Sequence, residues 1–277
     1  MLLGGAVVAA GSWWMGTRLT AAANRPVPAP ADLAVESVRI AEADSAGLAA
    51  WWVQANPERG AVVLLHSIRV DRRSMLSRAR LLLREGLSVL LVDLQAHGES
   101  AGERITFGFR ESDNARAALA WLRSRRPHVR VGIIGTSLGG AAVLLGPQPI
   151  GVDAVVVEAV YPDIRTSLEN RVRIRLGPLA PVLAPLLVVQ LRPRLGVEPA
   201  DLRPIKGIAG LGAPVLVVAG QLDRHTTLAE SEALFAAAAA PKELWIVVGA
   251  HHQDFLVKDP DGYRERVIGF LRRHLLL

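Results

Sequence analysis

The amino-acid sequence predicts an α/β fold: a mostly parallel, doubly wound sheet with a lid inserted along its chain. Three observations lead to this prediction. Short apolar runs rich in valine, isoleucine and leucine alternate with amphipathic stretches through most of the 277 residues. A Gly-x-Ser-x-Gly motif stands between one such run and the next helical stretch. An aspartate and a histidine then follow two later apolar runs, where parallel strands present their functional residues.

The first half of the expected domain begins at residue 35. Two short strands around a turn at 44–47 precede the regular alternation. Continuous apolar runs are typical of parallel strands that are buried on both faces, and the stretches between them have a helical pattern. In this half we expect strands at 35–43, 48–54, 61–66 and 87–93, with helices at 72–84 and 112–125.

The second half continues the alternation after the serine motif, and no internal repeat is visible. Each apolar run again has the length of a buried strand. We expect strands at 129–135, 152–160, 213–220 and 243–249, with helices from residue 137, at 228–239 and at 260–275. Residues 35–277 are therefore assigned to one domain, which is a usual size for a single domain of this class.

Residues 161–210 break the rhythm of strands and helices. They are rich in proline, leucine and arginine and contain no clear strand. The stretch 177–191 is apolar and interrupted by prolines. Ligands of doubly wound sheets bind at the carboxyl ends of the strands, so an insertion here predicts a lid over that edge. Such a lid would exclude water from acyl chains or other apolar groups.

The amino-terminal segment is unusually apolar. Residues 2–17 carry no charged side chain, and as a helix they would span about 24 Å, less than the roughly 30 Å of a hydrocarbon core. Residues 19–23 could extend the segment. We expect residues 1–24 to be a membrane anchor or a signal sequence, followed by a proline-rich linker at 25–34. The chain would then be membrane-associated through residues 2–23, or secreted or periplasmic if cleaved; a buried helix is the alternative.

The composition excludes several classes of protein. The chain has no cysteine, which rules out disulfides, a cysteine nucleophile and zinc–thiolate or iron–sulfur sites. Its 32 basic and 26 acidic residues give a net charge of +6, but they are dispersed, so nucleic-acid binding is not predicted. His251, His252 and Asp254 lack a further partner at metal-ligand spacing. We expect no metal, no cofactor and a small-molecule substrate.

The motif Gly135-Thr136-Ser137-Leu138-Gly139 indicates a nucleophile. A serine on so tight a turn between strand and helix needs small neighbours, which Gly135 and Gly139 provide. The turn also aims the amino terminus of the next helix at the serine, where an oxyanion would form. A glycine-rich turn without catalysis is the alternative. A dinucleotide-binding loop is excluded because Ser137 occupies the position of its second glycine.

A serine nucleophile needs a base, and the base needs an acid to orient it. In this topology the expected chain order is serine, acid and histidine. Asp223 follows the strand at 213–220, and His251 and His252 follow the strand at 243–249. Asp223 could instead cap the next helix. Glu158, near the end of the preceding strand, is the reserve acid.

These motifs resemble the α/β-hydrolase superfamily, especially its serine aminopeptidase, lysophospholipase and esterase-like branch. The resemblance covers roughly residues 35–277 and rests on the serine turn and on four further stretches: His66-Ser67-Ile68, Asp93-Leu94-Gln95-Ala96-His97-Gly98-Glu99-Ser100, Gly220-Gln221-Leu222-Asp223 and Gly249-Ala250-His251-His252.

The resemblance implies roles for particular residues. The last stretch is similar to the family's Gly-Ala-Gly-His, which makes His252 the base and leaves His251 at a glycine position. The backbone N–H groups of Ile68 and Leu138 would form the oxyanion hole, with His66 in a supporting role. Ser67 stands where the family usually has glycine. His97 is expected to hold its loop by hydrogen bonds.

The sequence therefore predicts a serine hydrolase that cleaves an ester or a related acyl bond through an acyl-enzyme. Ser137 would attack the carbonyl carbon, His252 would carry the proton to the leaving group, and Asp223 would hold the imidazole. A catalytically silent hydrolase-like binding protein is one alternative, suggested by Ser67. An acyltransferase or a peptidase on the same fold is another.

Overall fold

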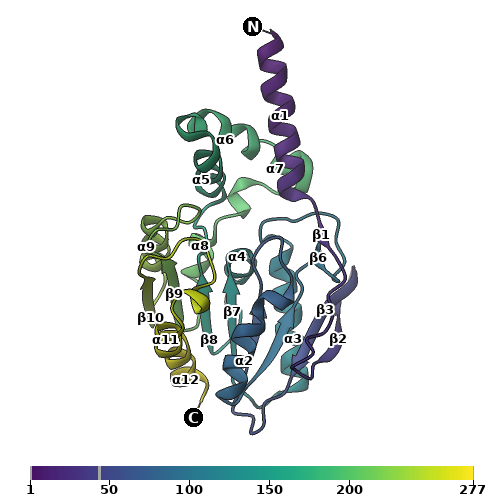
Figure 1. Cartoon of the computed structure of the whole chain (residues 1–277), viewed down its shortest axis with the longest axis vertical. Helices are drawn as coiled ribbons and strands as arrows, with labels where there is room; N and C mark the ends of the chain where they lie inside the picture. The colour runs from purple at the N-terminus through teal and green to yellow at the C-terminus, as the bar shows by residue number, and fades with distance from the viewer. Residues whose placement is uncertain (1, 43–44, 277) are drawn as a thin grey trace.

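The computed structural model describes residues 2–42 and 45–276. Within them, an eight-stranded sheet has the order β10-β9-β8-β7-β4-β5-β3-β2 (Figure 1). The six strands from β10 to β5 are parallel, whereas β3 is antiparallel to both β5 and β2. Their bounds are β2 Glu36–Glu42, β3 Ser45–Val53, β4 Gly60–Leu65, β5 Leu87–Val92, β7 Val131–Thr136, β8 Ala154–Glu158, β9 Val215–Gly220 and β10 Lys242–Val247.

The predicted fold class is confirmed. Each expected apolar run forms a strand, and β4, β5, β8 and β9 are buried along their whole length, as strands covered on both faces must be. The expected turn at 44–47 begins outside the described residues.

Helices cover both faces of the sheet (Figure 1). On one face the core contains apolar residues of α2, Leu76–Arg84, and α12, Gly269–Leu275. On the other face it contains those of α3, Glu111–Arg125, and α4, Leu138–Leu144, together with Leu234 of α9, Leu228–Ala237. Two short helices, α10 (Phe255–Lys258) and α11 (Pro260–Tyr263), lie between β10 and α12 in the chain.

Residues 161–210 form helices and no strand. The insertion consists of α5 Ile164–Leu176, α6 Ala180–Val188, α7 Leu191–Leu195 and α8 Pro204–Ile208, with short 3-10 turns at Gly177–Leu179 and Pro199–Asp201. Figure 1 shows α5, α6 and α7 beyond the end of the sheet at which β7 finishes. The insertion joins the main core through buried leucines such as Leu168, Leu187 and Leu191.

The prediction that residues 2–23 associate with a membrane is wrong. Leu2–Thr20 form helix α1, but among the described residues no helix is long and apolar enough to cross a membrane. Glycine, serine, threonine and tryptophan interrupt the aliphatic residues of this helix, and Arg18 places a charge in its last turn. The membrane localisation expected from the sequence is corrected accordingly.

Helix α1 instead packs beside α6 and α7 of the insertion (Figure 1). The Gln190 side-chain amide donates a hydrogen bond to Ser12 Oγ at 2.8 Å, and Arg194 Nη1 donates to Thr17 Oγ1 at 2.9 Å. The Arg194 guanidinium also lies 3.9 Å from the centroid of the Trp13 ring. Specific polar contacts therefore hold α1 against the insertion.

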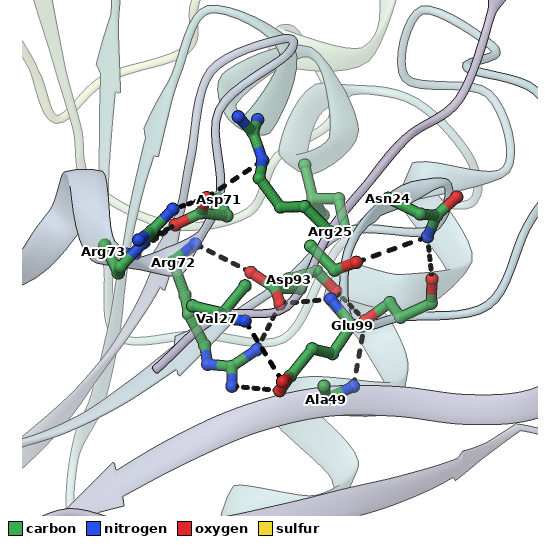
Figure 2. Close-up of polar contacts among 12 residues, drawn as sticks. Asn24, Arg25, Val27, Ala49, Asp71, Arg72, Arg73, Asp93 and Glu99 are labelled. Carbon is green, nitrogen blue, oxygen red and sulfur yellow. Dashed lines mark hydrogen bonds and ion pairs between the residues drawn. The ribbon is translucent and has the colours of Figure 1, made fainter. Parts of the chain in front are cut away.

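Residues 21–27, which we call the strap, connect α1 to the domain. Strand β1, Ala23–Asn24, pairs with β6, His97–Gly98, in parallel. Figure 2 shows the strap against the loop that follows β5: the Asn24 amide donates to Ser100 O at 2.6 Å, and the Val27 N–H donates to Glu99 Oε1 at 3.1 Å. The strap thus lies beside the carboxyl-terminal half of the Asp93–Ser100 motif and is hydrogen-bonded to it.

Candidate active site

Ser137 lies in the turn between β7 and α4 with a φ of 50° and a ψ of −106°. This backbone conformation is strained for a non-glycine residue, so neighbouring groups must hold it. The Ser137 N–H donates to the Glu158 carbonyl at 2.7 Å, and its own carbonyl accepts from the Ala141 N–H at 2.9 Å. The turn is therefore fixed on both sides of the serine.

The glycines of the motif are required by close packing. A Cβ atom on Gly135 would lie 2.6 Å from the backbone of Gly139, and one on Gly139 would lie 2.3 Å from the Leu65 carbonyl oxygen. Real Cβ atoms do not approach so closely. These small residues let α4 press against the ends of β7 and β4, which places the buried Ser137 at the carboxyl edge of the sheet.

Asp223 and His252 meet across the loops after β9 and β10. His252 Nδ1 is 2.7 Å from Asp223 Oδ2, and the Asp223 carboxylate is buried. Thr226 donates its hydroxyl to Asp223 Oδ2 at 2.8 Å and its N–H to Oδ1 at 3.0 Å. Burial by itself raises the pKa of Asp223, but the hydrogen bonds from His252 and Thr226 outweigh it and hold the pKa below its ordinary value.

The two loops are joined by their backbones. The Leu222 N–H donates to the Ala250 carbonyl at 2.8 Å. Gly220 makes this approach possible, because a Cβ there would lie 2.8 Å from the same carbonyl oxygen. Asp223 is not the cap of α9, which begins after Thr227, whose side chain accepts from the Glu230 N–H. The backbone bond to Ala250 and the Asp223 carboxylate therefore both hold the loop after β9 against the loop that carries His252.

The neighbouring histidines have different surroundings. His251 is exposed, and its Nδ1 lies 3.1 Å from the Leu222 carbonyl oxygen. His225 is half-buried, with its ring centroid 5.1 Å from that of His252. Burial, followed by the charge of His252, lowers the pKa of His225, which favours a neutral ring beside His252.

Ser137 lies on the same edge of the sheet as this pair. The strands that carry Ser137, Asp223 and His252 are β7, β9 and β10, separated only by β8. Between the Ser137 hydroxyl and His252 no hydrogen bond is present in the described part of the chain. The structure thus joins Asp223 to His252 directly and brings the serine turn to the same edge.

The loop after β4 contacts the beginning of α4. The His66 carbonyl accepts from the Gly139 N–H at 3.1 Å, which brings the loop with Ser67 and Ile68 to the helix that begins at Leu138. His66 Nε2 accepts from the Leu94 N–H at 3.1 Å, and Nδ1 lies 2.7 Å from the Ser67 carbonyl oxygen. Burial, and then the neighbouring His97, lower the pKa of His66 to about 3, so the ring is neutral.

His97 holds the next loop in the same way, as expected from the sequence. Its Nε2 accepts from the Arg69 N–H at 3.0 Å, and its Nδ1 lies 2.9 Å from the Gln95 carbonyl oxygen. Beneath this loop the buried Arg72 forms ion pairs with Asp93 and Glu99, as Figure 2 shows. The loops after β4 and β5 are therefore cross-linked.

Glu158, the reserve acid, has other partners. Its carboxylate is fully buried and pairs with Arg78 Nη2 at 2.6 Å. It also accepts from the Tyr263 hydroxyl at 2.6 Å and from the Thr136 hydroxyl at 3.0 Å. Sequence reasoning missed Arg78, Tyr263, Thr226 and His225, because no local pattern links these residues to the motifs.

Comparison with known proteins identifies the fold family. The sequence model described as "Alpha/beta hydrolase family" matches residues 62–266. The chain belongs to the α/β-hydrolase family. Among its relatives, the uncharacterized protein Rv2307c of Mycobacterium tuberculosis is 33% identical over 236 residues, covering 84% of this chain and 75% of the relative. The uncharacterized protein YqkD of Bacillus subtilis is 25% identical over 214 residues, covering 76% and 70%.

Solved structures of α/β hydrolases share the fold. The esterase Pf2001 of Pyrococcus furiosus superimposes with a TM-score of 0.73 at 21% identity, covering 91% of this chain and 98% of that one. The α/β hydrolase GrgF of Penicillium sp. sh18 superimposes with a TM-score of 0.68 at 19% identity, covering 88% and 99%. These neighbours show the fold, and membership of the family supports hydrolase activity in general.

Proposed function

We propose that this α/β hydrolase is a serine hydrolase that cleaves a carboxylic ester or a related acyl bond. Ser137 is the nucleophile, His252 the general base and acid, and Asp223 the residue that holds the imidazole. The observation that carries the proposal is the 2.7 Å contact between His252 Nδ1 and the buried Asp223 carboxylate, on the sheet edge where the strained Ser137 turn also lies.

The proposed reaction proceeds in two halves. His252 Nε2 takes the proton of the Ser137 hydroxyl as its oxygen attacks the acyl carbon, and then gives that proton to the leaving group. Water attacks the acyl-enzyme in the same way and releases the acid. The N–H groups of Ile68 and Leu138 stabilise the oxyanion in both halves. Hydrogen bonds between catalytic groups, such as the one proposed between the Ser137 hydroxyl and His252 Nε2, often tighten only when substrate is bound.

The expected acyl group is apolar. A mainly apolar hollow lies between the end of α1, the loop with Phe107 and helices α5, α6 and α7. Tyr161 donates its hydroxyl to the Phe107 carbonyl at 2.6 Å, and the next residue, Gly108, packs against Ala141 of α4. The hollow therefore borders a loop that rests on the helix following Ser137. Its volume of about 10 Å³ is too small for an acyl chain, so it is the apolar lining of the insertion near this edge that supports an apolar acyl group.

Labelling with a fluorophosphonate tests the nucleophile. We expect an adduct on the wild type and on Ser124→Ala, a control that removes an exposed serine from α3. Ser137→Ala should give no adduct. If the wild type forms no adduct at Ser137, the chain is a catalytically silent binding protein and the proposal is wrong.

A panel of p-nitrophenyl esters from acetyl to decanoyl tests the substrate class. We expect turnover that depends on Ser137 and rises with chain length over the middle of the series. An added alcohol distinguishes hydrolysis from acyl transfer. If the ester of that alcohol is the main product, the acyltransferase alternative replaces hydrolysis.

A further inference from the structure

A buried polar network lies beneath the proposed triad and is not part of it. Its centre is the Arg78 guanidinium on α2, whose side chain is only 2% exposed. Arg78 Nε and Nη2 donate to the two oxygens of Glu158 at 3.2 and 2.6 Å, and Nη1 donates to Asp254 Oδ2 at 2.9 Å. One cation thus joins two carboxylates, one at the end of strand β8 and one in the loop after β10.

On one side, the network contacts the serine turn. Thr136 and Glu158 are register partners of β7 and β8, and the Thr136 hydroxyl donates to Glu158 Oε2 at 3.0 Å. The Glu158 backbone carbonyl accepts the Ser137 N–H at 2.7 Å. Glu158 therefore holds the strained serine through its main chain and the preceding residue through its carboxylate.

On the other side, the network contacts the histidine loop. Asp254 follows His252 by two residues and caps α10, since its Oδ1 accepts from the Leu256 N–H at 2.9 Å. Its other carboxylate oxygen is the one paired with Arg78. The position of the chain just after His252 is thus fixed to the same guanidinium as the serine turn.

Tyr263 completes the network. Its hydroxyl accepts from Arg78 Nε at 3.1 Å and donates to Glu158 Oε1 at 2.6 Å. Burial and the charge of Glu158 raise the pKa of Tyr263 well above its ordinary value, so the hydroxyl keeps its proton. Buried ion pairs of this type add little net stability compared with apolar residues of similar volume, whereas their directional bonds fix geometry.

We propose that Arg78 and Glu158 are positioning residues that hold His252 at the correct place relative to Ser137. This inference rests on the proposed function, because it assigns to the network the alignment of that nucleophile and base. Neither residue touches the reacting atoms; each acts through the loop it holds. Misplacement by about 1 Å costs about 100-fold in rate, so small loosening of this network has a large effect on turnover.

The main test replaces the ion pair by apolar residues of similar length in the double variant Arg78→Met with Glu158→Leu. No charge is left unpaired between these two positions, so we expect a folded protein. We expect kcat for an ester substrate to fall about 100-fold while KM changes less than about threefold. A double variant with wild-type kcat would overturn the inference.

A milder pair of variants guards against misfolding of the double variant. Thr136→Val keeps the shape of the side chain but removes the hydroxyl that tethers Glu158. Thr136→Ser restores that hydroxyl. We expect Thr136→Val to lose about tenfold in kcat and Thr136→Ser to recover most of it. Equal rates for the two variants would contradict the proposed tether.

A matched control lies at the other end of the sheet. Glu58 pairs with Arg126 at 3.1 Å and accepts from Ser88, the second residue of β5, far along the strand from its carboxyl end. Glu58→Gln should reduce stability without changing kcat. If Glu58→Gln lowers kcat as much as the double variant does, the loss reflects general destabilisation and the inference fails.

A second readout does not require a substrate. The proton between His252 Nδ1 and Asp223 gives an NMR resonance that is assigned by its loss in His252→Gln. We expect the double variant to shift or broaden this resonance and Glu58→Gln to leave it unchanged. An unchanged resonance in the double variant would overturn the inference. A wild type that shows this resonance but no Ser137 labelling contradicts only the proposed function.

Discussion

The carboxyl ends of β8 and β9 are similar in sequence position but differ in chemistry. Each carries a buried carboxylate at the carboxyl edge of the sheet, Glu158 and Asp223. Glu158 is the last residue of its strand and pairs in register with Val218, inside β9. Asp223 lies beyond the end of β9 at Gly220. One carboxylate therefore lies within the layer of strands, and the other projects past it.

The partners differ accordingly. Glu158 pairs with Arg78, which keeps its charge at every accessible pH, because the charge of Glu158 outweighs the effect of burial and raises the pKa of Arg78 above its ordinary value. Asp223 pairs with His252, whose side chain is 21% exposed and able to exchange a proton. Proton transfer is open only to the second pair. Burial of an acid thus does not define its role; the partner does.

The sharpest test of this comparison is Asp223→Asn. Removal of the charge leaves the loop contacts in place but no longer favours the imidazole tautomer with a proton on Nδ1. We expect kcat/KM for an ester to fall by about 10⁴, with a folded protein by circular dichroism. A rate within about tenfold of wild type would show that Asp223 is not the acid that orients His252.

Much of this site could be predicted from the sequence because the relevant residues are local to strand ends. The chain order Ser137, Asp223, His252 follows from apolar runs and the residues just after them. The role of Glu158 could not be predicted in this way. Its partners Arg78 and Tyr263 lie 80 and 105 residues away, and only packing of α2 and α11 on one face brings them together.

The converse test compares the loss of folding stability when each of the two carboxylates is replaced. Glu158→Leu leaves Arg78 buried without its main counter-charge, so we expect the free energy of unfolding to fall by about 3–5 kcal/mol. Asp223→Asn should cost less, because His252 is partly exposed to water, whereas Arg78 is buried. Urea unfolding at neutral pH gives both values. A larger loss for Asp223→Asn than for Glu158→Leu would reverse the assignment of structural and catalytic carboxylates.

His66, in the loop after β4, makes the stability of the protein depend on pH. The pKa of His66 is about 3 in the folded chain and about 6.5 when unfolded. Between these values the unfolded chain binds a proton that the folded chain excludes, so stability is full above pH 6.5 and declines as the pH falls. From about pH 7.5 to pH 5 this costs about 2 kcal/mol.

Urea unfolding across this pH range, in wild type and in His66→Gln, measures the effect. The variant should be less stable at pH 7, because it loses the bond to the Leu94 N–H, but its stability should depend less on pH. Identical slopes in the two proteins would show that His66 does not contribute this linkage and that the loop after β4 is held by other groups.

The amino-terminal helix shows the other limit of sequence reasoning. Composition and charge distinguish an apolar helix from a polar one, but they do not show what covers it. The decisive residues for α1 are Gln190 and Arg194, which lie far along the chain in the insertion and bind Ser12 and Thr17. Hydropathy contains no information about such distant hydrogen bonds. The local signal against a membrane span is the glycine, serine, threonine and tryptophan residues within Leu2–Thr20, which leave this helix too little apolar to cross a membrane.

The smallest expected effect distinguishes His251 from His252. Of the two neighbouring histidines, the structure places His252 against Asp223, whereas His251 is exposed beside the Leu222 carbonyl. We therefore expect His251→Ala to keep kcat within about threefold of wild type, the size of change that a surface substitution gives. His252→Ala should be as inactive as Ser137→Ala, because members of a triad act as a unit and their losses do not add. Parallel kinetics of the three variants decide the matter: an inactive His251→Ala beside an active His252→Ala would shift the base by one residue and separate Asp223 from the chemistry.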